Sequence, residues 1–325
     1  MTFKFNMKVA FLFLITLITI SCKKDGQLET DIANMNTDIK VERFDRFVAE
    51  ASLKDFNKLK QAYPFMFSEK DNDSTWMETK SDTLQLQLFD EVNKAFGYFN
   101  ETEIEIESLF NHIKYYFPEF NPPRVITTTS YVDFRNRVFV SDTILVLALD
   151  SYLGSDHEFY VNIQKFITSN LKKEQIVVDL AGEYAEKYIY QKQNKTLLDE
   201  MIYYGKQLYF KDVVIPFKTE AERIGYSQEQ LDWAIANESL IWRYFVEREL
   251  LFSTDSKLSD RFINPAPFSK FYLEDIDTDS PGRLGQYIGW QIVRAYMKQN
   301  DVKLKDRLIT STEDVFNNSK FKPRK

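Results

Sequence analysis

The chain has 325 residues, of which 44% are hydrophobic and 15% aromatic, with one cysteine, two histidines and a formal net charge of −7. The acidic balance argues against nucleic acid as a partner, and the single cysteine excludes an intramolecular disulfide and any site with several cysteine ligands. The length is sufficient to bury one substantial core, so we expect a single large domain.

The first 21 residues have the pattern of an export signal. Lys4 and Lys8 precede an apolar run over 9–20, and Ser21 and Cys22 come directly before a polar segment. About 12 apolar residues are fewer than the ~20 that a membrane-spanning helix needs, whereas a basic start, a short apolar stretch and a small residue are typical of a cleaved signal peptide. A cysteine directly after the cleavage point indicates a lipoprotein. We predict cleavage after residue 21 and lipidation of Cys22.

The segment after the signal is expected to be a tether. Residues 22–39 are polar and lack periodicity, which predicts a flexible linker, so the folded domain is expected over 40–325. Residues 41–47 alternate briefly as a short strand does, and 53–63 carry apolar side chains at helical spacing. The polar cluster over 71–74 is interpreted as a surface turn.

The middle of the chain contains the only clear β region. Helices are predicted over 84–98 and 102–117, and the Val-, Ile- and Thr-rich segments that follow predict strands over 124–131, 137–141 and 143–149.

After the strands the apolar pattern is helical. Helices are expected over 157–170, 173–192, 197–212, 227–252, 257–263, 281–299 and 304–311. The predicted fold class is therefore α+β, mainly α-helical with one small sheet of about three strands. Gly285 and Gly289 lie four residues apart within a predicted helix, where glycine is unfavourable, and we interpret them as a place where another helix crosses closely.

The two histidines limit the possible catalytic chemistry. His157-Glu158 begins like the zinc-peptidase motif His-Glu-x-x-His, but position 161 is valine, so the second ligand is missing. We interpret His157-Glu158 as a helix start and His112 as a surface residue. The sequence has no Gly-x-Ser-x-Gly turn and no glycine-rich phosphate loop, and we predict no cofactor and no metal. Paired-carboxylate catalysis stays open because there are 49 acidic residues.

Within the predicted helix over 227–252, Glu238 and Arg243 are a candidate functional pair. Ordinary exposed salt bridges, worth about 0.3–0.5 kcal/mol each, are the simpler interpretation of the charged residues there. A buried Glu238 close to Arg243 would favour a functional role.

Five segments of the chain resemble a known family. They are Val41–Asp45, Leu149–Gly154, Met201–Lys206, Asn237–Tyr244 and Ser280–Val293. Together with the lipoprotein signal, they make nearly the whole mature chain similar to the gliding-motility lipoprotein GldB family. The resemblance implies a role in gliding motility and type IX protein secretion, with other proteins of that machinery as partners and no established catalytic activity.

That family in turn looks distantly like predicted zinc peptidases that carry His-Glu-x-x-His on a central helix behind a small sheet. If the scaffold is shared, the segment Gly182–Glu186 occupies the motif position without either histidine. This fold-level analogy implies a degenerate zinc-peptidase-like scaffold, a pseudo-enzyme that binds. It makes Glu183 and Glu186 candidate functional or partner-binding residues, beside Glu238 and Arg243.

The sequence therefore predicts a lipid-anchored cell-envelope protein that supports gliding motility and type IX secretion by binding and not by catalysis. The alternative is an envelope hydrolase or metallopeptidase-like enzyme with a divergent carboxylate-rich site. A third possibility, a surface nutrient-binding lipoprotein, would require an exposed aromatic platform. Because the residue after Cys22 is Lys23 and not aspartate, we expect the periplasmic face of the outer membrane.

Overall fold

The computed structural model describes residues 26–67, 73–191, 195–300 and 303–324. The predicted signal peptide and Cys22 lie outside the described residues. Within the described ranges, none of the helices combines the length and the apolar character that crossing a membrane requires.

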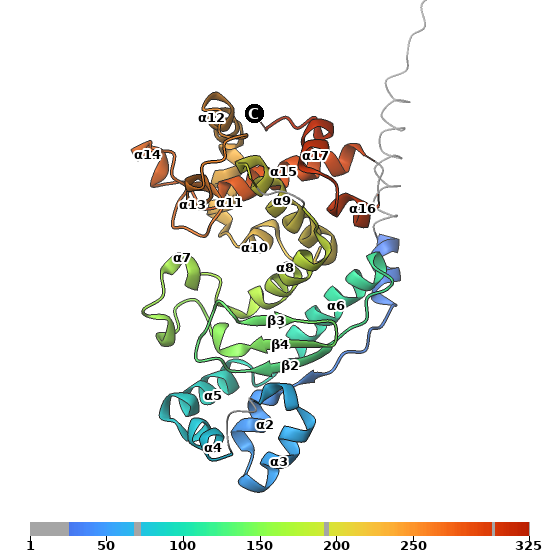
Figure 1. The fold of residues 1–325 in the computed structure, drawn as a ribbon, viewed down its shortest axis with the longest axis vertical. Helices are drawn as coiled ribbons and strands as arrows, with labels where there is room; N and C mark the ends of the chain where they lie inside the picture. Colours follow the sequence, from blue (N-terminus) through green and yellow to red (C-terminus); the bar gives the residue numbers. More distant parts are fainter. Residues whose placement is uncertain (1–25, 68–72, 192–194, 301–302, 325) are drawn as a thin grey trace, which may run out of the picture.

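A four-stranded sheet lies in the middle of an elongated molecule (Figure 1). Its strands are β1 (Val41–Glu42), β2 (Arg124–Thr128), β3 (Val138–Val140) and β4 (Ile144–Ala148), in the order β1-β2-β4-β3. β2 runs parallel to β1 and β4, while β3 pairs antiparallel with β4. The three strands predicted around residues 124–149 are confirmed. The short strand predicted over 41–47 is confirmed only at 41–42, where it adds a parallel edge, and the chain is helical from Phe44.

Alternating side chains give the sheet two buried faces. Ile126 packs with Phe44 and Val48, on the side covered by the first helices of the domain. Val125 and Leu145 contribute to the larger core on the opposite side. Since successive side chains of a strand point to opposite faces, both faces need a helical cover.

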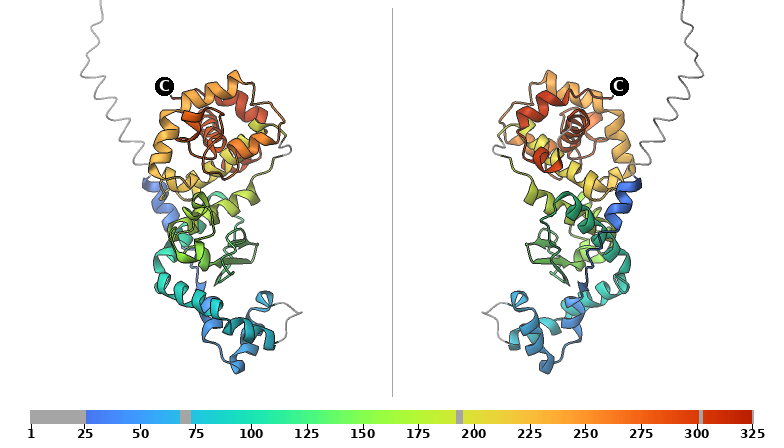
Figure 2. Two further views of the ribbon diagram at one scale, coloured as in Figure 1. Left: turned by 90° about the vertical axis from the view of Figure 1, so that its left-hand side faces the viewer. Right: turned by 90° about the vertical axis from the view of Figure 1, so that its right-hand side faces the viewer.

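The first cover consists of α2 (Phe44–Glu50), α3 (Leu53–Ala62), the short η1 (Pro64–Met66), α4 (Asp73–Ser81) and α5 (Thr83–Ala95). The other face is covered by α6 (Asn100–Tyr116) and α8 (Ile176–Tyr188). Figures 1 and 2 show these helices on either side of the sheet.

A larger lobe, which we call the helical lobe, contains most of the remaining helices. It is built around α9 (Leu197–Val214) and α15 (Leu284–Gln299), with α10 (Glu220–Ile224), α11 (Gln228–Ala236), α12 (Glu238–Glu247), α13 (Lys257–Phe262), α14 (Glu274–Asp277), α16 (Leu304–Leu308) and α17 (Thr312–Ser319) around them. α9 joins the two parts of the molecule, because Met201 and Ile202 lie in the core of the helical lobe while Phe210 and Val214 lie in the core behind the sheet.

The crossing of α9 and α15 depends on two glycines. A Cβ added to Gly289 would overlap the backbone oxygen of Met201, and one added to Gly205 would overlap the backbone of Gly289. Gly285 packs in the same way against α13, at Phe262. The prediction that Gly285 and Gly289 mark a close helix crossing is confirmed.

Two predicted helices differ from the structure. The segment 157–170 contains only η3 (Glu158–Tyr160) and α7 (Lys165–Thr168), because it offers no continuous apolar stripe: Val161 is exposed at a central position. The segment 227–252 is divided into α11 and α12 at Asn237, whose side-chain amide donates a hydrogen bond to the Trp233 carbonyl at 2.9 Å. Such local bonds compete with the regular helix ladder.

The predicted tether also differs from the structure in part. Residues 26–33 are helical, and Ile32 is buried. Glu29 lies 3.2 Å from Nε2 of His112, and the Thr37 amide donates to Asn111. The one apolar side chain that the helix buries against the domain explains why this polar segment is held to α6.

The cluster predicted as a surface turn over 71–74 lies partly outside the described residues. Its last two members, Asp73 and Ser74, begin α4. The short η2 (Leu149–Ser151) follows β4, and η4 (Lys173–Gln175) leads into α8.

Candidate functional site

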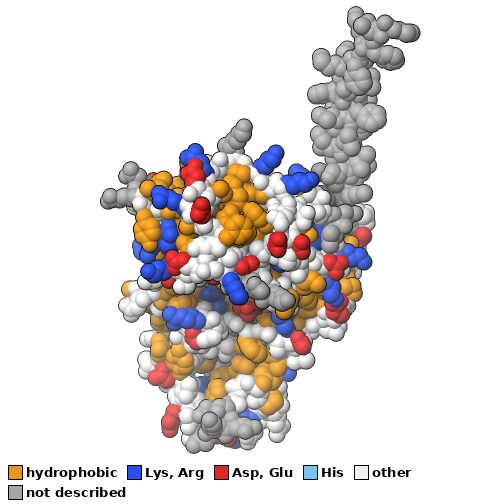
Figure 3. All heavy atoms as spheres, turned by 45° about the horizontal axis from the view of Figure 1, so that its top comes forward, with side chains coloured by type: hydrophobic (Ala, Val, Ile, Leu, Met, Phe, Trp, Pro, Cys, Tyr) orange, Lys and Arg blue, Asp and Glu red, His pale blue; other side chains and the backbone are white. Residues whose placement is uncertain are grey.

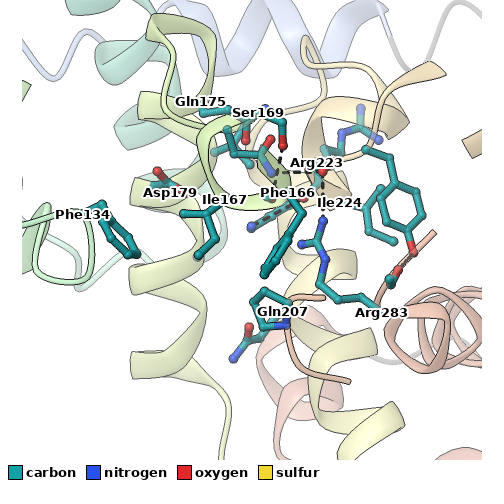
Figure 4. A pocket seen from close by; sticks show the side chains of 18 of the residues that line it. Phe134, Phe166, Ile167, Ser169, Gln175, Asp179, Gln207, Arg223, Ile224 and Arg283 are labelled. Atoms are coloured by element: carbon teal, nitrogen blue, oxygen red, sulfur yellow. Dashed lines mark hydrogen bonds between the residues drawn. The ribbon is translucent and has the colours of Figure 1, made fainter. Parts of the chain in front are cut away.

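A polar cavity of about 580 Å³ lies where the sheet region meets the helical lobe (Figure 4). Its walls come from the loop before β3, from α7 and α8, from the second half of α9, from the α10–α11 turn and from the loop that leads into α15. We call it the junction cavity. Its volume falls in the range of small-molecule and cofactor sites, about 300–1,000 Å³.

The acidic wall of the cavity is one face of α8. Asp179, Glu183 and Glu186 recur at three- and four-residue spacing and all line the cavity. Asp179 is fixed by two donors, Nε of Arg137 at 2.7 Å and the hydroxyl of Tyr152 at 2.8 Å. Arg137 precedes β3, so this ion pair ties the sheet to α8.

Lys211 brings a cation into the cavity from α9. Its Nζ lies 3.5 Å from the Arg223 carbonyl oxygen, and it has no carboxylate within ion-pair distance among the described residues. Burial lowers the pKa of Lys211 to about 8, against the attraction of Asp179, and repulsion from Arg283 and Arg137 adds to the shift. Lys211 therefore titrates close to neutral pH.

Arg283 supplies a second cation at the start of α15. Its backbone is left-handed, with φ 61°, and its Nη2 donates to the Gly225 carbonyl at 2.9 Å. The guanidinium lies over the ring of Tyr226, 5.3 Å from its centroid. Burial lowers the pKa of Arg283, and no carboxylate within the described parts of the chain pairs with it. Figure 4 shows Arg283 reaching toward the α10–α11 turn.

The third cation of this wall, Arg223, is neutralised from outside the cavity. It donates to Asp212 at 2.8 Å, and Asp212 also accepts bonds from Arg294 at 2.7 Å and from the Trp290 indole at 2.8 Å. Arg223 therefore belongs to a structural network that joins α9, α10 and α15.

The rest of the lining is amide and apolar. Amide side chains come from Asn170, Gln175, Gln207 and Gln230, and the apolar surface comes from Phe134, Val138, Phe166, Ile167 and Ile224. In Figure 4, Phe166, Ile167 and Arg283 lie around the same space as Gln207. Nε2 of Gln207 is buried and has no hydrogen-bond partner within the described structure.

Two of the four predicted candidates line this cavity. Glu183 and Glu186 are both exposed at its edge. Partial loss of hydration raises the pKa of Glu183, and repulsion from Glu186 and Asp179 adds to the rise. Neither glutamate has an ion-pair partner within the described residues, so both present free carboxylates to the cavity mouth.

The other two candidates lie elsewhere and apart from each other. Glu238 is buried at the start of α12, where it accepts bonds from the Tyr287 hydroxyl at 2.8 Å and from the Arg324 amide at 2.9 Å. Arg243 is exposed, and its closest carboxylate is that of Glu247 at 3.8 Å. The expected contact between Glu238 and Arg243 is absent from the described structure, and Glu238 instead holds the C-terminal segment against α15.

Neither histidine lines the cavity. His157 caps η3 by accepting the Phe159 amide at 3.3 Å, as its interpretation as a helix start predicts. His112 is buried, with Nδ1 2.7 Å from the Ser108 carbonyl oxygen, so its interpretation as a surface residue was wrong. Over the described ranges, no three His, Cys, Asp or Glu side chains come together in a way that would hold a metal ion.

The sequence reasoning missed the two free cations and the Arg137–Asp179 pair. Arg283 stood within one of the segments that carry the family resemblance, but nothing in its neighbours indicates a left-handed backbone. Lys211 lies in a helix that was predicted correctly, and only the packing of α8 and α10 shows which face of α9 borders a cavity.

Fold and site together define a mainly helical α+β protein with a ligand-sized polar cavity at the junction of its two parts. The sequence model of the family described as "Gliding motility protein GldB" matches residues 25–323, nearly the whole chain. The chain therefore belongs to the GldB family, and it is a gliding motility-related lipoprotein.

No curated protein and no solved structure matches the chain. The suggested zinc-peptidase-like scaffold thus has no support from a known structure and stays an analogy.

Proposed function

We propose that this lipoprotein is anchored in the cell envelope through Cys22 and supports gliding motility and type IX secretion by binding a ligand in the junction cavity. Family membership supports the connection with motility. The observation that carries the binding role is the cavity itself, in which Lys211 and Arg283 are desolvated without an anionic partner among the described residues.

Unpaired, partly buried cations destabilise a fold. Transfer of a charge out of water costs free energy unless a counter-charge or several hydrogen bonds compensate. A bound ligand that carries the missing negative charge would provide this compensation. Perturbed cations in a cavity are therefore typical of a functional site.

The acidic wall of the cavity fits a binding role better than it fits hydrolysis. Glu183 and Glu186 are exposed at the cavity mouth, and Asp179 is held in an ion pair with Arg137. Under the binding role the two exposed glutamates are dispensable.

Complementation of a deletion strain tests this function. The strain receives the wild-type gene, a Cys22→Ala variant, or a variant with Glu183→Ala and Glu186→Ala, and is scored for colony spreading and for secretion. We expect the double variant to restore both, and the Cys22→Ala variant to restore neither. Normal spreading and secretion in the deletion strain itself would overturn the proposal.

An enzyme is the second candidate function, and one observation favours it. Lys211 has a lowered pKa and Glu183 a raised one in the same cavity, which is the pattern of a base and an acid tuned toward neutral pH. Lys211→Arg separates the two candidates, because arginine keeps the charge but stays protonated. Binding predicts that Lys211→Arg retains spreading, and an envelope hydrolase predicts its loss.

The membrane face is part of the proposal. The sequence Cys22-Lys23-Lys24-Asp25 has no aspartate next to the cysteine, which supports transfer to the outer membrane, facing the periplasm. Fractionation of the two membranes should place the protein with the outer membrane, and protease added to intact cells should leave it uncut.

A further inference from the structure

The charges that line the junction cavity leave one positive charge uncompensated. Five basic and three acidic side chains line it. Arg137 pairs with Asp179, and Arg223 pairs with Asp212 outside the cavity. The remaining basic residues are Arg135, Lys211 and Arg283, and the remaining acidic residues are Glu183 and Glu186. A ligand with a single negative charge would balance this set.

The free cations lie on the inner wall and the free carboxylates at the mouth. Lys211 and Arg283 are partly buried, whereas Glu183 and Glu186 are exposed. An anionic group would therefore be attracted to the inner wall, while the carboxylates at the mouth would oppose a ligand with a high charge. This arrangement disfavours a phosphate dianion.

The remaining lining matches a peptide. The amide side chains of Asn170, Gln175 and Gln207 offer both donors and acceptors, as a peptide backbone requires. The buried Nε2 of Gln207 is an unused donor within the described structure. Phe166 and Ile167 supply apolar surface beside Arg283 (Figure 4), suited to a neighbouring apolar side chain.

We propose that the junction cavity binds a protein segment by one carboxylate, seated between Lys211 and Arg283, with its backbone on the amide side chains and an adjacent apolar side chain against Phe166 and Ile167. This inference rests on the proposed binding function and names the chemistry of the partner. The carboxylate belongs either to a chain terminus or to an acidic side chain.

Equilibrium dialysis against peptide mixtures tests the inference. The lipidated protein, purified in detergent, is dialysed against N-acetylated tripeptides of mixed sequence with free C-terminal carboxylates, and against the same mixture with amidated ends. A third arm uses N-acetylated, amidated tripeptides with one central Asp or Glu, and retained peptide is quantified by mass spectrometry.

We expect at least one of the two carboxylate-bearing mixtures to be retained about tenfold more than the amidated mixture that lacks a carboxylate, since one charge-assisted contact is worth about that factor. The arm that is retained identifies the source of the carboxylate. Equal retention of all mixtures, no retention of any, or displacement by inorganic phosphate at a lower concentration than by acetate would overturn the inference.

Two lysines on α9 provide a matched pair of variants. Lys211→Met should abolish the preference for the carboxylate. Lys206→Met should keep it, because Lys206 lies outside the cavity and donates to the Thr310 carbonyl at 2.6 Å. An equal loss in both variants would mean that the effect reports on folding and would also contradict the inference.

The dialysis result and the spreading of the Lys211→Met strain together distinguish a failure of this inference from a failure of the proposed function. If no mixture is retained while a Lys211→Met strain fails to spread, the ligand class is wrong and the function stands. If carboxylate peptides bind but the Lys211→Met strain spreads normally, the site exists and the proposed function is wrong.

Discussion

At the scale of single residues, the contrast between Lys206 and Lys211 is the most informative feature of the molecule. Both lie on α9, and burial lowers the pKa of each to about 8. Lys206 has a carbonyl acceptor at 2.6 Å, whereas Lys211 has only a distant one at 3.5 Å. Desolvation of the charge at position 211 therefore costs free energy that no strong internal contact offsets. A residue that lowers stability in this way is typical of a functional site.

Lys211→Met should therefore stabilise the protein without ligand. Methionine has about the same helix propensity as lysine. Because the substitution removes the Lys211 ammonium group, it also removes the cost of desolvating that charge. We therefore expect the free energy of unfolding at pH 7 to rise by about 1 kcal/mol. Lys206→Met should lower it, because the Thr310 carbonyl loses its donor. Denaturant unfolding measures both. A lower stability for Lys211→Met would show that the ammonium group has a compensating contact.

The stability difference should also depend on pH in a defined direction. The pKa of Lys211 is about 8 in the fold, below its ordinary value of 10.5. The unfolded chain therefore holds this proton more tightly, and the stability that Lys211 contributes rises as the pH increases from about 8 toward 10.5. The charges that act on Lys211 are Asp179, Glu183, Arg137 and Arg283.

Unfolding of wild type and Lys211→Met, compared between pH 7 and 9.5, checks this dependence. The stability advantage of the variant should shrink above pH 8, because folded wild type then loses the Lys211 proton while its unfolded chain keeps that proton until about pH 10.5. A difference that stays constant with pH would contradict a lowered pKa.

At the scale of secondary structure elements, the crossing of α9 and α15 holds the helical lobe together. Gly205 and Gly289 allow the two helix backbones to touch, and Asp212 on α9 binds Trp290 and Arg294 on α15 at 2.7–2.8 Å. The first residues of α15 also border the junction cavity through Arg283. The position of this helix therefore determines both the core and the site.

Gly289→Ala should disrupt this crossing. The added Cβ would overlap the Met201 carbonyl oxygen, and backbone cannot move aside as a side-chain tip can, so we expect a loss of about 3 kcal/mol in the free energy of unfolding. Gly182→Ala is the control, because its Cβ would meet only Lys211 atoms at 3.5 Å. That variant should stay within about 1 kcal/mol of wild type. Equal effects in thermal or denaturant unfolding would argue against the crossing.

The same elements show what the sequence could and could not predict. The long helices over 197–212 and 281–299 and the strands after residue 124 were predicted because each has a continuous apolar period. The helix predicted over 157–170 was wrong because its apolar side chains form no continuous stripe, and the break at Asn237 depends on a side-chain bond that periodicity does not detect. Glu183 and Glu186 were found on α8 by analogy, but Lys211 and Arg283 come together only through tertiary packing.

At the scale of the whole molecule, the structure places a binding cavity between a sheet with helical covers and a helical lobe. Figure 3 shows the helical lobe from above, with hydrophobic side chains in separate patches among acidic and basic ones. Exposed hydrophobic residues in this lobe include Leu240, Val246 and Phe252. On the face drawn in Figure 3, hydrophobic side chains alternate with charged ones, and we assign function to the cavity.

The lipid anchor should be separable from the fold. Cys22 lies outside the described residues, and the sheet and the helices that cover it begin at Val41. Cys22→Ala should therefore abolish incorporation of labelled palmitate and release the protein from the membrane pellet, while protease resistance of the domain is unchanged. The control variant is Thr310→Ser, in the C-terminal part of the domain, which should leave labelling intact. Palmitate labelling of the Cys22→Ala protein would contradict the predicted anchor.

The most direct test of the central claim is colony spreading of a deletion strain that carries either Lys211→Met or Lys206→Met, with equal amounts of membrane-bound protein confirmed by immunoblot. Binding in the junction cavity predicts that the Lys211→Met strain fails to spread, although its protein is folded and anchored, and that the Lys206→Met strain spreads. Normal spreading with Lys211→Met would contradict a role for the cavity in motility.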